Sequence, residues 1–182
     1  MSRLNVIIAP DKRLKQKAMK VEKFDENLKA FANDLVETMK AGDGCGIASI
    51  QVDDDKSFAY DSLIEGYRPQ PRIIIVKIHD LIIAVNPEII ANTEEKACNP
   101  EGCLSIPNLR MDIERYTNIS VKFQDLKGKE HIIECDGYES ICFQHEIDHL
   151  NGILAPDRTP SMQQLLLWKK FDQINNMVKH RR

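Results

Sequence analysis

The chain has 182 residues, of which 42% are hydrophobic and 29% charged, so its length and composition suit a single globular domain, residues 1–182, with a sizeable core. A formal net charge of −3, apolar runs too short to span a bilayer, and no apolar signal core at the start give no reason to expect DNA or a membrane as a partner. The five cysteines are an odd number, which argues against a disulfide scaffold and favours a reducing, cytoplasmic setting.

The first predicted element is an amphipathic helix. Apolar residues recur there at helical spacing, Asp25 can cap its start, and Gly42 can end it. A glycine-rich segment follows directly. The polar, proline-containing stretch 53–72 then predicts a long loop, with a short strand at 57–60 inside it.

The middle of the chain predicts four β-strands in two pairs. Asn86-Pro87 is expected to end the second strand, and a turn around Lys127-Gly128 is expected to join the last two as a hairpin. The pairs, in chain order, are residues 73–78 with 81–85 and residues 119–123 with 131–135.

Two helices are predicted in the last third of the chain. The first begins after Asp136, which can form a capping box with Glu139, and Gly152 can end it. A proline-bounded connector leads to a final helix over about residues 161–182, with an apolar stripe and a basic end. The order of elements predicts an α+β fold in which mostly antiparallel sheets surround the first of these two helices.

That helix contains the most informative motif of the chain, His-Glu-Ile-Asp-His at residues 145–149. Two histidines four residues apart lie one helical turn apart on the same face, so both imidazoles can reach one metal ion. Glu146 between them would point at the open coordination position of that ion. The sequence therefore predicts His145 and His149 as metal ligands.

A third protein ligand is needed to complete a catalytic metal site. Downstream, the zinc-protease pattern with a third histidine fails because that position is Ala155, and no glutamate follows Glu146. Asp157 remains a candidate, although it lies among prolines in a connector. Upstream, Cys103 follows Gly102 in an extended segment, and a thiolate is an excellent ligand for Zn or Fe(II).

Three motifs of this chain resemble those of the peptide deformylase family, whose members remove the N-formyl group from newly made chains. The family signature is Gly-x-Gly-x-Ala-Ala-x-Gln, Glu-Gly-Cys-Leu-Ser and Gln-His-Glu-x-Asp-His, found here at residues 44–51, 101–105 and 144–149. The first motif departs at Ser49, where the family has alanine. The resemblance covers nearly the whole chain, except that the polar stretch after Gln51 replaces a short turn.

The resemblance implies a role for each motif residue. Glu146 would transfer a proton to the leaving amine, while the Gln51 amide and the Leu104 backbone N–H would face the developing oxyanion. Three residues would bind one divalent metal ion: Cys103, His145 and His149. Five residues would shape or border the substrate pocket: Cys45, Gly46, Arg110, Ile141 and Cys142.

The resemblance also implies the cofactor and the partners. Fe(II) is the expected metal in the cell, with Zn, Ni or Co able to occupy the same ligand set. The expected substrates are N-formylmethionyl nascent peptides, and the basic end of the C-terminal helix is a candidate contact to the ribosome. Asp43 and Arg115 match positions that form an ion pair in relatives.

Two other functions fit the His-Glu-x-x-His motif taken alone. A metalloprotease that cuts internal peptide bonds would use the same helix, but an upstream thiolate ligand and the lack of a downstream one argue against it. A non-catalytic zinc-binding module would close its site with four protein ligands, whereas the sequence nominates three. The sequence therefore favours a hydrolase over both alternatives.

Overall fold

The structure is a computed structural model, and it describes residues 2–53 and 70–179. The strand expected at 57–60 and most of the loop expected at 53–72 lie outside the described residues, as do residues 180–182 of the basic tail. Three α-helices occur in the described part: α1 (Glu26–Ala41), α2 (Gly137–Leu150) and α3 (Ser161–Lys179). Three short 3₁₀ helices accompany them: η1 (Lys12–Lys15), η2 (Ser49–Gln51) and η3 (Ala155–Arg158).

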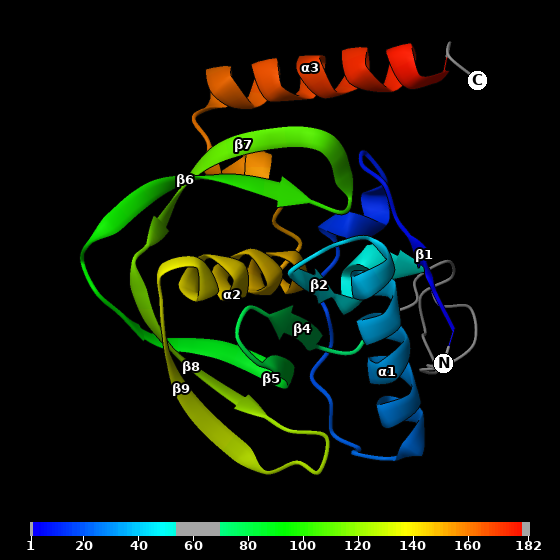
Figure 1. Cartoon of the computed structure of the whole chain (residues 1–182), viewed down its shortest axis with the longest axis vertical. Coiled ribbons are helices and arrows are strands. Elements are labelled where there is room, and N and C mark those ends of the chain that lie inside the picture. The colour runs from blue at the N-terminus through cyan, green and yellow to red at the C-terminus, as the bar shows by residue number, and fades with distance from the viewer. Residues whose placement is uncertain (1, 54–69, 180–182) are drawn as a thin grey trace.

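The strands of the described segments form three antiparallel sheets. These sheets and α1 surround α2, which lies in the middle of the molecule (Figure 1). The largest sheet has the order β2-β4-β5-β8-β9, and two small sheets pair β1 with β3 and β6 with β7. The strands are β1 (Asn5–Val6), β2 (Gly46–Ala48), β3 (Val52–Asp53), β4 (Ile73–Lys77), β5 (Leu81–Asn92), β6 (Lys96–Cys103), β7 (Ile106–Tyr116), β8 (Asn118–Gln124) and β9 (Glu130–Asp136). The observed architecture is the predicted α+β fold.

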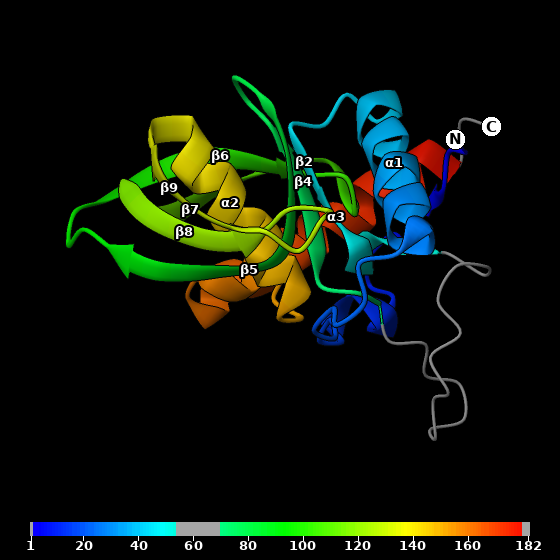
Figure 2. The ribbon, with the colours of Figure 1, turned by 90° about the horizontal axis from the view of Figure 1, so that it is seen from below.

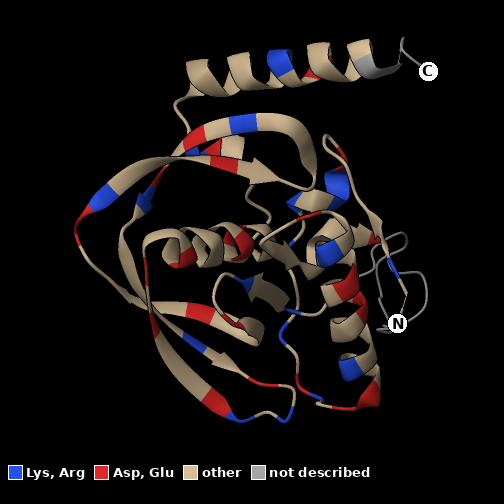
Figure 3. Ribbon diagram, viewed as in Figure 1, with Lys and Arg blue, Asp and Glu red and all other residues tan. Residues whose placement is uncertain are grey.

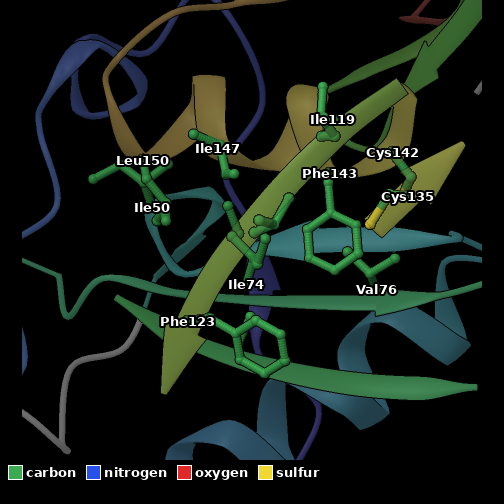
Figure 4. Close-up of a cluster of buried hydrophobic side chains, with 13 residues drawn as sticks. Ile50, Ile74, Val76, Ile119, Phe123, Cys135, Cys142, Phe143, Ile147 and Leu150 are labelled. Carbon is green, nitrogen blue, oxygen red and sulfur yellow. The ribbon is translucent and has the colours of Figure 1, made fainter. Parts of the chain in front are cut away.

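The five-stranded sheet lies between α1 and α2, which cover opposite faces of β2 and β4 (Figure 2). Alternate residues of a strand point to opposite faces of its sheet, and β4 is apolar on both. Ile74 and Val76 belong to the cluster that contains Phe143 of α2 (Figure 4), whereas Ile73 and Ile75 belong to the cluster built on α1. The sheet thus fixes α2 in the middle of the molecule.

The third core cluster holds α3 against the rest of the molecule. Phe171 is fully buried there among apolar residues of β7, such as Met111 and Ile113, and beside Leu154 of the connector. Figure 1 shows α3 lying across the outer side of the β6–β7 pair. Within the described segments, no helix combines the length and the apolar character needed to cross a membrane.

Several local predictions are confirmed. The Asp25 carboxylate accepts a hydrogen bond from the Leu28 N–H at 3.0 Å and caps α1, which ends at Gly42 as expected. The two predicted strand pairs are β4 with β5 and β8 with β9. Gly128 adopts a φ of +79° in the hairpin turn and Gly152 a φ of +73° beyond α2, a backbone region that favours glycine.

Two local predictions are wrong. Asn86-Pro87 does not end a strand: β5 continues to Asn92, because an irregular register between Val85 and Glu88 spans the proline, which cannot donate to a neighbouring strand. Asp136 does occupy the N-cap position of α2, but its side chain makes no capping hydrogen bond, so the expected box with Glu139 does not form.

Candidate metal centre

The two histidines of α2 point into one small region beside the β6–β7 sheet. His145 and His149 are both buried, and their Nε2 atoms lie 3.2 Å apart. Burial lowers the pKa of His149 well below its usual value, which keeps that imidazole neutral, the form that binds metal ions. One helix therefore supplies two convergent nitrogen donors.

The third donor comes from the end of β6. The Sγ atom of Cys103 lies 3.3 Å from Nε2 of His149, and the ligand atoms of Cys103, His145 and His149 all lie within 4.8 Å of one another. Two ligand atoms bound at about 2.1 Å in tetrahedral geometry are separated by about 3.4 Å. The three donors therefore fit one divalent metal ion, and Asp157, the other sequence candidate, instead contacts Lys15 and the Leu154 N–H.

A buried ionic chain supports His145 from behind. Oε2 of Glu101 lies 2.7 Å from Nδ1 of His145, and Arg115 bridges Glu101 and Asp148. Burial opposes ionisation of Glu101, but its hydrogen bonds with His145 and Arg115 outweigh that effect and hold its pKa below the ordinary value. A charged Glu101 favours a proton on Nδ1 of His145, so that Nε2 is the atom that would bind a metal ion.

Two details of this network of ion pairs were not predicted from sequence. The prediction of an Asp43–Arg115 ion pair is wrong: among the described residues, Arg115 forms its ion pairs with Glu101 and Asp148, while Asp43 lines the cavity. Arg158 of η3 also binds Asp148 and extends the network of ion pairs to the surface. The one sequence signal for Glu101 was its place in the Glu-Gly-Cys motif.

Glu146 lies beside the donors and faces β2. Its side chain is buried, Oε2 has no hydrogen-bond partner among the described residues, and burial raises its pKa to about 8. Gly46 makes this approach possible, since a Cβ there would collide with the Glu146 carboxylate and lie 2.9 Å from Sγ of Cys142. A carboxyl oxygen without a partner in this position can exchange a proton with a bound molecule.

Gln51 presents its amide nitrogen toward Cys103. The Ala48 N–H donates to Oε1 of Gln51 at 2.8 Å, which orients the amide so that Nε2 lies 3.6 Å from Sγ of Cys103 and 3.2 Å from Oγ of Ser105. Leu104 follows Cys103 at the tip of the β6–β7 pair and lines the same cavity. These groups place neutral hydrogen-bond donors next to the metal ligands.

A cavity of about 340 Å³ opens beside these residues. It is lined by residues from all three motifs, whereas His149 lies behind the others and is not part of the lining. Tyr138 also lines it and was not predicted, although it lies one helical turn before Ile141 and Cys142, a spacing that could have indicated it. The residues predicted as catalytic, metal-binding or substrate-binding that line the cavity are Cys45, Gly46, Gln51, Cys103, Leu104, Arg110, Ile141, Cys142, His145 and Glu146.

Comparisons with known proteins agree with one another. The family model described as "Polypeptide deformylase" matches residues 3–165. The chain is 37% identical over 175 residues to a peptide deformylase of Brucella suis, covering 96% of this chain and 94% of that relative. A peptide deformylase structure from Legionella pneumophila superposes with a TM-score of 0.84 at 30% identity, covering 100% and 99% of the two chains. One from Ehrlichia chaffeensis in complex with actinonin gives 0.82 at 31% identity, covering 95% and 98%.

Proposed function

Because the chain belongs to the peptide deformylase family, whose members are metal-dependent hydrolases, we propose a division of roles among the residues of its cavity. The protein removes the N-formyl group from N-formylmethionyl peptides of newly made proteins. The observation that carries the assignment of roles is the convergence of the ligand atoms of Cys103, His145 and His149 within 4.8 Å of one another, beside the cavity that Glu146 lines.

Cys103, His145 and His149 hold one divalent metal ion, and Glu101 keeps His145 in the tautomer that binds it. When bound, such an ion polarises a carbonyl group and acidifies a coordinated water. Three protein ligands leave a coordination position open, as catalytic rather than structural sites do. This donor set, two imidazoles and one thiolate, supports a hydrolytic role over a closed structural module.

Glu146 acts as the general base and then as the general acid. Its carboxylate accepts the proton of the attacking water and delivers it to the amine that leaves when the formyl C–N bond breaks. Its buried position and the lack of a hydrogen-bond partner for its Oε2 atom among the described residues support this assignment. Transfer by a positioned group of this kind typically contributes about 10²–10⁴ in rate.

Gln51 and Leu104 stabilise the charge that develops on the formyl oxygen. The Gln51 amide and the Leu104 backbone N–H are neutral donors, so they favour the oxyanion without neutralising the cysteine thiolate. The Ala48 N–H, which holds the Gln51 Oε1 atom, supports this role because it leaves the NH₂ group to donate.

The remaining cavity residues bind the substrate. Ile141 and Cys142 offer an apolar wall to the methionine side chain, and Cys45 and Gly46 lie next to Cys142 in the same lining. Arg110 is exposed at the rim and would contact the peptide beyond its first residue.

The test is formate release from a formyl-Met peptide by the metal-loaded protein and by Glu146→Gln. The variant should keep its metal and its fold and lose about 10²–10⁴ in turnover. Glu139→Gln, the same change two turns earlier on α2, is the matched control and should retain activity. Turnover within tenfold in Glu146→Gln would refute the proton-transfer role, and cleavage of internal peptide bonds without formate release would favour the metalloprotease alternative.

Fe(II) is the metal we propose for the cell, on the strength of the family resemblance. The same ligands accept Zn, and divalent Zn usually binds such a set more tightly than Fe(II). Protein purified without oxygen should therefore contain iron and lose activity in air, while Ni- or Co-loaded protein should be active and air-stable. Full activity with Zn and indifference to oxygen would contradict the proposal.

We further propose that the protein works in the cytoplasm and that α3 contacts the ribosome. Lys169 and Lys170 are exposed on α3, in the basic band midway along that helix (Figure 3), and such a cluster is attracted to RNA phosphates. Changing both to Glu should weaken co-sedimentation with ribosomes at low salt and leave turnover of a short peptide unchanged. Lys127→Glu with Lys129→Glu, at an exposed hairpin turn, is the charge-matched control; equal co-sedimentation of the two double variants would contradict the contact.

A further inference from the structure

Two cysteine side chains meet in the wall of the cavity. Cys45 lies just before β2 and Cys142 lies on α2, 97 positions later, yet their Sγ atoms are 3.7 Å apart. Both line the cavity. Neither is needed as a metal ligand or as a nucleophile in the hydrolysis described above, so the thiol pair has no chemical role there.

The surroundings make the two sulfurs unequal. The Cys142 thiol donates a hydrogen bond to Cys45 and lowers the pKa of Cys45 to about 6, against the opposing effect of partial burial. The hydroxyl of Tyr138, 3.5 Å from Sγ of Cys45, acts in the same direction. The same thiol contact, together with burial, raises the pKa of Cys142. Cys45 is therefore the more exposed and the more acidic of the two cysteines, and Cys142 is the one that more readily keeps its proton.

The other cysteines of the described chain lack this combination. Cys135 is buried, and burial raises its pKa to about 12, which keeps it an unreactive thiol. Cys98 is exposed on β6, outside the cavity lining, and Cys103 belongs to the metal-binding set. Figure 4 shows that Cys135 lies in the same hydrophobic cluster as Cys142, so it is the competitor that a test must exclude.

We propose that Cys45 and Cys142 form a peroxide-sensitive modification site, in which an intramolecular disulfide closes the substrate pocket reversibly. The sulfurs need to approach by about 1.7 Å to reach a disulfide bond length of about 2.05 Å. The Cys45 thiolate attacks one oxygen of hydrogen peroxide, the O–O bond breaks, and Cys45 becomes a sulfenic acid with release of hydroxide. The Cys142 sulfur then attacks Sγ of Cys45, the S–O bond breaks, and the departing hydroxide takes the Cys142 proton. Two thiols lose two electrons, and peroxide becomes two waters.

The bond would form where the wall of the pocket is closely packed. Sγ of Cys142 lies 2.9 Å from the place where a side chain on Gly46 would begin, and the Glu146 carboxylate lies against the same glycine. Drawing Cys45 toward Cys142 narrows the space next to the catalytic carboxylate. The effect on turnover rests on the proposed function of this wall, whereas formation of the disulfide does not.

The experiment uses the full chain loaded with Ni(II), which avoids the reaction of Fe(II) with peroxide. After treatment with hydrogen peroxide and alkylation of free thiols, digestion without reductant should yield a peptide joining Cys45 to Cys142, with two thiols lost. Turnover should fall and return with dithiothreitol. Cys98→Ser should behave like the parent protein, whereas Cys45→Ser should yield no joined peptide and no reductant-reversible loss, whatever its basal activity.

Three results would overturn the proposal. They are a peptide joining Cys135 to Cys142, sulfinic acid at Cys45 without any joined peptide, and reversible inactivation that persists in Cys45→Ser. Undiminished turnover in fully joined protein would overturn the closure of the pocket. Formate release by the untreated protein tests the proposed function separately, so the two hypotheses can fail independently.

Discussion

Helices α2 and α3 differ in how much of their surface is buried. From Ser140 to Leu150 every side chain of α2 is buried, with one side against the large sheet and the other toward the cavity and the β6–β7 pair. Helix α3 buries a stripe around Phe171 and exposes large apolar residues elsewhere, including Leu165 and Leu166. Of these two helices, only α2 carries residues that we propose as metal ligands or as the proton-transferring group.

The difference shows what burial does to polar residues. A buried polar group must find a partner, and the partners of His145, Asp148 and Gln144 come from β6, β7 and the connector. The polar side of α2 is therefore positioned by several elements at once. The polar groups on the outer side of α3 are exposed to solvent and need no such partners. We therefore expect substitutions around α2 to change metal binding or turnover, and substitutions in the buried stripe of α3 to change stability without changing either.

The largest effect is expected for Cys103→Ala. Removing the thiolate leaves two imidazoles, so the purified protein should lose tight metal binding and formate release should fall to background. Metal content measured by elemental analysis checks this. Cys98→Ala, at an exposed position on the same strand, should retain both; full metal occupancy in Cys103→Ala would remove that residue from the ligand set.

Gln51→Ala should have a smaller effect than Cys103→Ala. Loss of one oxyanion donor typically lowers kcat by about 10²–10³, and the loss should exceed any rise in KM because the contact forms mainly in the transition state. Steady-state kinetics at constant metal content would measure this. A change confined to KM would assign Gln51 to substrate binding instead.

Glu101→Ala and Asp148→Ala separate positioning from general stability. Both remove one carboxylate from buried Arg115 and should destabilise the protein by about 3–5 kcal/mol, measured by chemical denaturation. Only Glu101 contacts His145, so only Glu101→Ala should also weaken metal binding, by about 10–100-fold in a competition assay. Equal loss of metal affinity in both variants would show that the Glu101–Arg115–Asp148 ion pairs position His145 together, and that Glu101 does not do so alone.

The smallest effect on turnover is expected on α3. Phe171→Ala should cost about 3–5 kcal/mol of unfolding free energy, because the residue is fully buried, while the folded protein keeps its metal and its kcat. Leu166→Ala, at a side chain 58% exposed, should change stability by no more than about 0.5 kcal/mol. A fall in kcat for folded Phe171→Ala would mean that α3 helps to shape the site.

The local predictions succeeded where a single element decides the outcome. The spacing of His145 and His149 fixes their common face whatever surrounds the helix, and Asp25 caps α1 with a backbone N–H three residues away. The Asp136 side chain makes no such capping hydrogen bond. Pro87 was expected to end a strand, but it lies within β5 because an irregular register with β8 accommodates it. The irregularity at Pro87 depends on how β5 pairs with β8, which the local sequence does not indicate.

The sequence by itself determined the fold class, the three motifs and the candidate ligands, since each depends on residues close together in the chain. Tertiary structure decided which distant groups meet. Arg115 forms ion pairs with Glu101 and Asp148 and not with Asp43, and Cys45 contacts Cys142 although 97 positions separate them. Contacts of this kind depend on how the sheets pack around α2, because residues far apart along the chain carry no local pattern that identifies their partners.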